Sequence, residues 1–202
     1  MGKTIRLNSC KFILLSLIIA SCSPFCIAQK DLKLDSLLNA LHIVKDDTSK
    51  VNTLNAISYH LLSITAKYTD AKRYADSALN LAIKVFFKKG IAKAYLIIGL
   101  VYKKQSNYSE ALKNFLASLK IREEIGDKNG IASSYTYIGN IYFAQGNYPE
   151  ALKNYLASLK IQEEIGDKKQ IALVNDNIGN IYYVQGNYPE ALNNYLVALK
   201  IS

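Results

Sequence analysis

Residues 107–127 read NYSEALKNFLASLKIREEIGD, and residues 147–167 read NYPEALKNYLASLKIQEEIGD. The two stretches begin 40 residues apart and differ at three of 21 positions. A third copy, NYPEALNNYLVALKI, begins 40 residues later at position 187. A fixed period of this length is typical of stacked units that cannot bury their apolar faces alone. The repeat therefore predicts a solenoid, an architecture that more often holds partners than performs chemistry.

Each unit contains two helical patterns. In the first, over residues 129–145, the apolar residues Ile131, Tyr135, Ile138 and Tyr142 recur at spacings of three and four. Gly146 follows it and can adopt the left-handed backbone conformation that ends a helix. The first half of the unit is therefore predicted to be one helix.

The second pattern covers residues 149–165. Pro149 suits the first turn of a helix, where its missing N–H costs nothing. Gly166 is expected to end this helix and Asp167 to cap the next one. Linkers of two to four residues make neighbouring helices antiparallel.

The period divides the chain into expected segments. Tyr59 stands where the later units have Gly99, Gly139 and Gly179, which predicts a wider helix crossing or a shifted register in the first unit. An amphipathic helix at 31–44 could cover the N-terminal end, and Asp46 to Ser49 form a turn that caps the next helix. The expected segments are a signal peptide (1–28), a capping helix and turn (29–50), a diverged unit (51–91), two full units (92–131 and 132–171) and a unit truncated at its C-terminal end (172–202).

The repeat resembles the tetratricopeptide repeat in a long, 40-residue form. The residues that carry the resemblance are Tyr135, Ile138, Gly139, Tyr142, Tyr148, Ala151, Tyr155, Ser158 and Ile161. The usual Trp is replaced by Tyr135, and the unit is six residues longer than the commonest form. The resemblance implies an all-α fold, a right-handed α-α superhelix of antiparallel helix pairs. It also implies that small residues allow close helix approach and that the first helix of each unit lines a concave groove.

The first residues are typical of an export signal. Lys3, Arg6 and Lys11 precede the apolar run FILLSLIIA at 12–20, and Cys26-Ile27-Ala28 resembles a cleavage site. An uncleaved anchor made of residues 12–28 is the alternative. Ile19-Ala20-Ser21-Cys22 also resembles a lipobox, which would make Cys22 a lipidated first residue. The expected location is the periplasm or the outer face of the inner membrane, or the envelope if the chain is a lipoprotein.

Cysteine usage and charge limit the chemistry. Cys10, Cys22 and Cys26 are the only cysteines, and cleavage after Ala28 would remove all three. The net charge of +9 would fall to +6, and the remaining lysines recur once per unit. We interpret them as solvated helix faces, and expect no nucleic-acid partner.

No catalytic, metal or cofactor site is expected. His42 and His60 lie on different predicted helices without a metal-binding spacing, and we interpret both as surface or groove residues. Glu123-Glu124 and Glu163-Glu164 are neighbours that point about 100° apart on a helix, unlike an acid–base pair. The chain is therefore predicted not to be an enzyme.

The concave groove that the tetratricopeptide resemblance implies is a candidate peptide-binding surface. Its residues lie on the first helix of each unit and differ between units. Asn140 and Asn180 lie one unit apart on one face, where they could form hydrogen bonds with the backbone of an extended peptide. The alternative is that they are only polar, solvent-exposed residues of the concave face. The full set is Leu100, Lys103, Lys104, Thr136, Asn140, Phe143, Asp176, Asn180 and Tyr183.

The leader, the DSLLNAL helix at 35–41 and the DDTSKVNTLN turn at 46–55 add a second resemblance. Together with the repeats they are similar to exported N-terminal regions of signalling proteins in Bacteroidetes-type bacteria, which precede a histidine kinase, a cyclase or a DNA-binding output domain. This resemblance implies an exported scaffold that binds a protein or peptide, the sensing or docking part of a signalling system. The alternatives are a fragment of a larger signalling enzyme and a lipoprotein adaptor of the envelope. A membrane partner is expected only through Cys22 or a later transmembrane helix.

The last unit stops at Lys200-Ile201-Ser202, where its predecessors continue for another turn. We expect Ser202 not to be a natural end, and expect an apolar strip among Leu192, Leu196 and Leu199 to fray or to self-associate.

Overall fold

The computed structural model describes residues 32–201 and divides the chain into two units, residues 1–44 and 45–202. The predicted signal peptide, its cleavage sites and Cys22 lie outside the described residues. Residues 32–43 of the first unit are helical, and their role as a cap stays a prediction.

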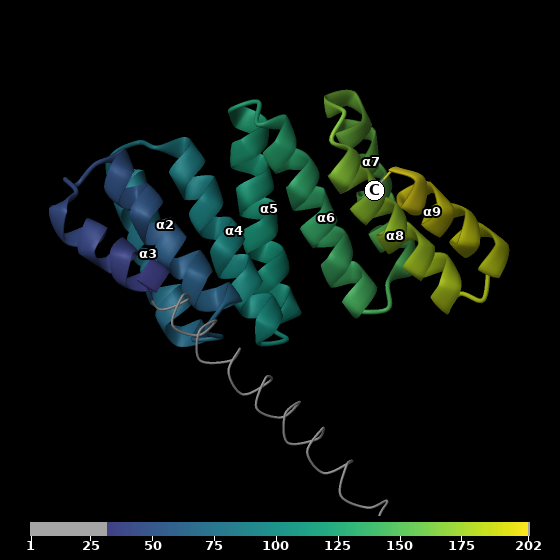
Figure 1. The fold of residues 1–202 in the computed structure, drawn as a ribbon, viewed down its shortest axis with the longest axis horizontal. Coiled ribbons are helices and arrows are strands. Elements are labelled where there is room, and N and C mark those ends of the chain that lie inside the picture. The colour runs from purple at the N-terminus through teal and green to yellow at the C-terminus, as the bar shows by residue number, and fades with distance from the viewer. Residues whose placement is uncertain (1–31, 202) are drawn as a thin grey trace, which may run out of the picture. The chain divides into compact units, whose positions relative to one another are not determined.

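The second unit is an array of antiparallel helix pairs stacked in chain order (Figure 1). The described residues contain no strand, and the fold is the predicted all-α, right-handed superhelix. We call α2, α4, α6 and α8 the first helices and α3, α5, α7 and α9 the second helices. Their bounds are α2 Thr48–Ser63, α3 Tyr68–Lys84, α4 Lys88–Lys104, α5 Tyr108–Glu124, α6 Lys128–Ala144, α7 Tyr148–Ile165, α8 Lys168–Val184 and α9 Tyr188–Ile201.

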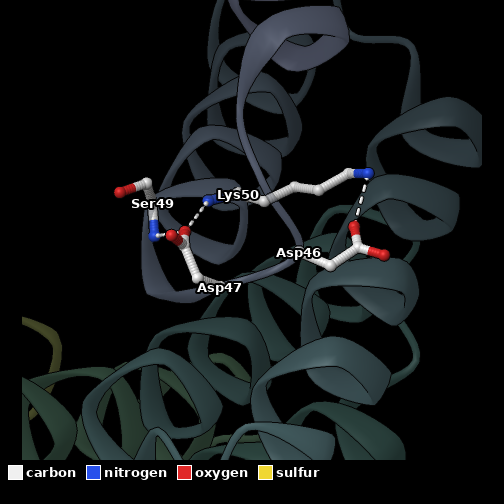
Figure 2. Close-up of polar contacts among 4 residues, drawn as sticks. All are labelled: Asp46, Asp47, Ser49 and Lys50. Atoms are coloured by element: carbon white, nitrogen blue, oxygen red, sulfur yellow. Dashed lines mark hydrogen bonds and ion pairs between the residues drawn. The ribbon is translucent and has the colours of Figure 1, made fainter.

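Side-chain caps begin most of these helices, because the first backbone N–H groups of a helix have no partner within it. Asp127 and Asp167 accept hydrogen bonds from backbone amides at the starts of α6 and α8, at 3.0 and 3.1 Å. At the start of α2 the Oδ1 atom of Asp47 accepts from Ser49 N at 2.7 Å, and Lys50 reaches back to Asp46 (Figure 2). The predicted capping turn before α2 is confirmed.

Small residues set the distance between the two helices of a pair. A Cβ atom added to Gly139 would lie 2.6 Å from the ring of Tyr155. Gly99 has the same relation to Phe115, and Gly179 to Tyr195. A ring from the second helix therefore lies directly on the backbone of the first, which is why the period keeps glycine at this position.

The first pair reaches the same packing through a shifted register. The linker between α2 and α3, residues 64–67, is one residue longer than the linker between α4 and α5. Ser58, rather than Tyr59, takes the place of the glycine: it is fully buried and donates to the carbonyl oxygen of Ala71 at 2.5 Å. Tyr59 is turned outward and is 51% exposed. Of the two alternatives expected for Tyr59, the structure has the shifted register.

The shifted register also buries a histidine. His60 is only 6% exposed, and its Nε2 atom has no hydrogen-bond partner within residues 32–201. The sequence-based interpretation of His60 as a surface or groove residue is wrong, because the extra linker residue rotates it into the core. His42 is exposed.

The end of the array at α9 exposes side chains that its predecessors bury. Leu199 is 74% exposed, whereas Leu119, two units earlier, is 8% exposed and packs in a core cluster. Leu192 is 58% exposed, whereas Leu152 is half-buried against the next helix pair. Leu196 differs, because at 43% it is no more exposed than its equivalents Leu116 and Leu156. The apolar strip at this end therefore contains Leu192 and Leu199, but not Leu196.

Candidate functional site

One longitudinal strip of each first helix stays exposed or half-buried, and these strips together form what we call the inner surface. In solenoids of this kind the inner side is concave and offers an extended binding surface. The residues recur at spacings of three and four, so they share one face of each helix. They are Asn52, Tyr59 and Ser63 on α2; Lys89, Lys93, Leu100 and Lys104 on α4; Asn129, Ser133, Tyr137, Asn140 and Ala144 on α6; and Lys169, Leu173, Asn177, Asn180 and Val184 on α8.

The inner surface brings residues of separate helix pairs together. Tyr137 of α6 lies close enough to Tyr59 of α2 for the two phenols to interact, although α4 stands between their helices in chain order. Burial, and after it the neighbouring Tyr59, raise the pKa of Tyr137. Its ring also stacks on Phe115, with the centroids 5.4 Å apart. Tyr137 is thus a half-buried member of the inner surface that packs against the pair before it.

Four of the predicted groove residues lie on this surface: Leu100, Lys104, Asn140 and Asn180. Leu100 and Asn140 are half-buried, and the other two are exposed. They come from three consecutive first helices, so a ligand that crosses the array could contact all of them.

The two asparagines have a structural role that the sequence analysis missed. The hydroxyl of Tyr155 donates to Oδ1 of Asn140 at 2.7 Å, and that of Tyr195 donates to Oδ1 of Asn180 at 2.8 Å. Where the second helix has Phe115, which cannot donate, the first helix has Leu100. The amide nitrogen of each asparagine has no partner among the described residues and remains free to donate to a ligand.

Thr136 is not a groove residue, and its assignment is a correction. It is 8% exposed, and its hydroxyl lies 2.8 Å from that of Ser158 on α7. Its Oγ1 atom also donates to the carbonyl oxygen of Ala132. Thr136 points towards its own partner helix, because it lies three residues before the glycine that contacts that helix.

Three of the remaining predicted residues share one position of the first helices, on the side where the following pair packs. Phe143 packs in the cluster formed by α7 and α8, and Lys103 is half-buried at the equivalent position. Burial, and then the charge of Lys104, lower the pKa of Lys103. Tyr183 occupies this position on α8 and is exposed, with its ring 5.7 Å from that of Tyr188. Asp176 occupies the position of Thr136 one unit later and is exposed. None of these four residues lies on the inner surface.

Charge divides the two sets of helices. The first helices carry nine lysines and one acidic residue, Asp176. The second helices carry nine basic and nine acidic residues. The sequence-based interpretation, in which lysines are spread evenly along the array, misses this division because it counts by unit and not by helix.

Five of the nine lysines on first helices lie on α4, which contains no acidic residue. Lys88 pairs with Glu124 at 3.0 Å. The other four have no ion-pair partner within the described residues: Lys89, Lys93, Lys103 and Lys104. The signal that could have found Lys89 and Lys93 is the helical spacing from Leu100, which places them on one face.

Other chemical sites are not prominent in the described part of the chain. Within residues 32–201 no three His, Cys, Asp or Glu side chains gather where they could hold a metal ion. None of the helices described there is both long and apolar enough to cross a bilayer. An open depression beside α3, lined by Lys72, Arg73, Asp76 and Gln105 among others, contains the ion pair Lys72–Asp76 and faces solvent broadly.

Sequence comparison agrees with the geometry. Two sequence models of the tetratricopeptide repeat match the chain, one over residues 92–125 and one over residues 130–202. The chain carries tetratricopeptide repeats. No curated protein sequence gives a significant match.

Solved tetratricopeptide-like structures share the fold at low identity. A Rap protein complexed with Competence and Sporulation Factor is 21% identical over 89% of this chain, with a TM-score of 0.78. Aspartyl phosphate phosphatase F from Bacillus subtilis is 16% identical over 86%, with a TM-score of 0.76. The chain spans 51% and 49% of those two proteins. MamA is 17% identical over 89% of this chain and 92% of its own length, with a TM-score of 0.60.

Proposed function

We propose that this protein is an exported scaffold that binds a protein or peptide on its inner surface, as the sensing or docking part of a bacterial signalling system. The observation that carries the proposal is the inner surface itself. It extends over the four first helices and exposes apolar and aromatic side chains, among them Tyr59, Leu173 and Val184. Exposed apolar residues that lie together are a feature of interaction sites.

Three further points support a partner-binding role. Tetratricopeptide repeats generally serve as non-catalytic interaction scaffolds, and we propose no enzymatic activity for this chain. The Rap protein that shares the fold was solved in complex with Competence and Sporulation Factor, although this chain spans only 51% of that protein. The amide groups of Asn140 and Asn180 are anchored through their oxygens, so their N–H groups are already oriented towards a ligand backbone.

A peptide-display selection against the purified repeat region tests the binding role. The inner variant carries Tyr59→Ser with Leu173→Ser, at positions 51% and 48% exposed. The outer control carries Leu116→Ser with Leu156→Ser on second helices, at 48% and 50%. Ligands selected on the wild type should lose affinity for the inner variant and keep it for the outer one. Ligands that are indifferent to the inner variant, or lost equally on both, would contradict the proposal.

Export is a separate part of the proposal and rests on the leader sequence. The intact mass of the protein secreted by an expression host distinguishes the two processing routes: a chain beginning at Gln29, or a lipidated chain beginning at Cys22. Retention of the full leader in the cytosol would contradict export.

A further inference from the structure

We infer that the ligand of the inner surface is an acidic peptide segment, and that it lies along α4. This inference rests on the proposed function and names the chemistry of the partner. The basis is a group of residues that we call the basic strip: Lys89, Lys93 and Lys104, with Leu100 between the last two.

The basic strip occupies one face of α4. Lys89 and Lys93 are four residues apart, and so are Leu100 and Lys104, while seven residues separate Lys93 from Leu100. These spacings place all four side chains on one face of a helix. The three lysines are exposed and Leu100 is half-buried. The strip therefore presents charge at both ends and an apolar contact towards one of them.

Nothing in the described structure neutralises this strip. The inner-surface residues on either side of it, on α2 and α6, are uncharged: Asn52, Tyr59 and Ser63, and then Ser133 and Asn140. By contrast, lysines of the second helices have acidic neighbours, as in the pairs Lys113–Glu110 and Lys153–Glu150. A concave surface with one sign of charge concentrates its field and attracts the opposite charge.

Lys103 lies beside the strip, on the side of α4 that faces the next pair. The residue is half-buried and has no carboxylate partner within residues 32–201, and burial together with Lys104 lowers its pKa. A carboxylate bound at Lys104 would offset that repulsion. The free protein thus holds cationic groups in an arrangement that an anionic ligand would relieve.

The dimensions of the strip define the ligand. At 1.5 Å rise per residue, Lys93 lies about 10 Å from Leu100 along the helix, and Leu100 lies about 6 Å from Lys104. An extended peptide advances about 3.3 Å per residue and points successive side chains to opposite sides, so only residues two or four apart face the same helix. Two residues span the distance from Leu100 to Lys104, and four residues span the distance from Lys93 to Leu100 within the reach of the flexible lysine side chain. The strip therefore fits a segment with the pattern acid-x-x-x-apolar-x-acid, in which the apolar side chain contacts Leu100.

Fluorescence anisotropy tests the inference with labelled ten-residue peptides. One carries Glu-Ser-Ser-Ser-Leu-Ser-Glu at its centre, a second has lysine in place of both glutamates, and a third has serine in place of leucine. The first should bind with at least tenfold higher affinity than the other two, and raised ionic strength should weaken it.

Two matched double variants test whether the acidic peptide binds at the basic strip. Lys93→Gln with Lys104→Gln should lower the affinity for the acidic peptide at least tenfold and flatten its salt dependence. The control, Lys120→Gln with Lys160→Gln, removes two exposed, unpaired lysines from second helices and should change the affinity less than twofold. Equal losses in both pairs would indicate a net-charge effect and would overturn the inference.

Two further outcomes would also overturn it. One is that a single-stranded oligonucleotide or an anionic lipid vesicle depends on Lys93 and Lys104 while the acidic peptide does not bind. The other is that peptides selected on the inner surface lose affinity through Tyr59→Ser and Leu173→Ser but not through the lysine changes. The second outcome would leave the proposed binding function intact, so failure of the two proposals can be told apart.

Discussion

At the scale of single residues, one position on the first helix and one position on the second helix change together from unit to unit. Tyr155 faces Asn140 and Tyr195 faces Asn180, each through a hydrogen bond. Phe115 has Leu100 at the equivalent place, within one apolar cluster. A tyrosine hydroxyl near the core needs a hydrogen-bond acceptor, whereas a phenylalanine ring, which has no hydroxyl, packs best against an apolar neighbour. The residue type at this position of the inner surface therefore depends in part on the aromatic residue that packs against it from the second helix.

This pairing changes what an asparagine substitution should do. From the sequence alone, replacing Asn140 and Asn180 with alanine is expected to leave stability unchanged. The structure predicts instead that Asn140→Leu costs about 1–3 kcal/mol, because the largely buried Tyr155 hydroxyl loses its acceptor. Burial also raises the pKa of Tyr155, so the phenol stays protonated and remains a donor at neutral pH.

A double-mutant cycle in urea measures the effect. Asn140→Leu with Tyr155→Phe reproduces the natural Leu100 and Phe115 pair and should recover most of the lost stability. If the two changes were simply additive, the hydrogen bond would not couple the residues.

The glycine that contacts this ring gives a second prediction. Gly139→Leu should destabilise the array by about 1–3 kcal/mol, because even its Cβ would lie within the contact distance of Tyr155. Ala144→Leu adds similar volume on the exposed side of the same helix and serves as the control. Equal thermal midpoints for the two variants would show that the close contact is absent in solution.

At the scale of elements, the turns after the helices differ between early and late units. The backbone is left-handed at Gly126, Gly146, Gly166 and Gly186. In the earlier turns the same conformation falls on Ala66, Phe86 and Ser106, with φ of 52°, 56° and 59°. A residue with a side chain is strained there, by about 1–2 kcal/mol. The early turns thus keep the geometry that the repeat requires without the residue that suits it.

Phe86→Gly should stabilise the protein by about 1 kcal/mol. Phe86 is 90% exposed, so the change removes strain at φ 56° with little loss of packing. The measurement is the chemical-denaturation midpoint. The converse change Gly166→Phe, at the same position two units later, should lower the midpoint. A loss of stability in Phe86→Gly would mean that its ring packs in solution.

At the scale of the whole molecule, two surfaces decide what the array can bind. One is the inner surface with its basic strip. The other is the end of the array at α9, where Leu192 and Leu199 are exposed although their equivalents are covered by the next pair. An exposed apolar strip at the end of a solenoid favours association.

We therefore expect the repeat region, residues 32–202, to self-associate through α9. Leu192→Glu with Leu199→Glu should shift it towards the monomer in sedimentation velocity. Leu116→Glu with Leu156→Glu, at exposed positions on α5 and α7, is the matched control and should not. A wild-type protein that stays monomeric at high concentration would contradict the expectation.

The sequence by itself determined the architecture, because a 40-residue period with glycine, alanine and tyrosine at fixed places permits few packings. It also located the cap at Asp167 and the turn at Gly146, since these depend on local backbone chemistry. Only the tertiary structure decided the direction of each side chain. Thr136 and Asn140 are four residues apart on one helix, yet Thr136 is buried against Ser158 and Asn140 is only half-buried. The rotation of a helix about its axis depends on contacts with both neighbouring pairs. One extra linker residue likewise buried His60 and exposed Tyr59. Those contacts join residues distant in sequence, and only the folded array brings them together.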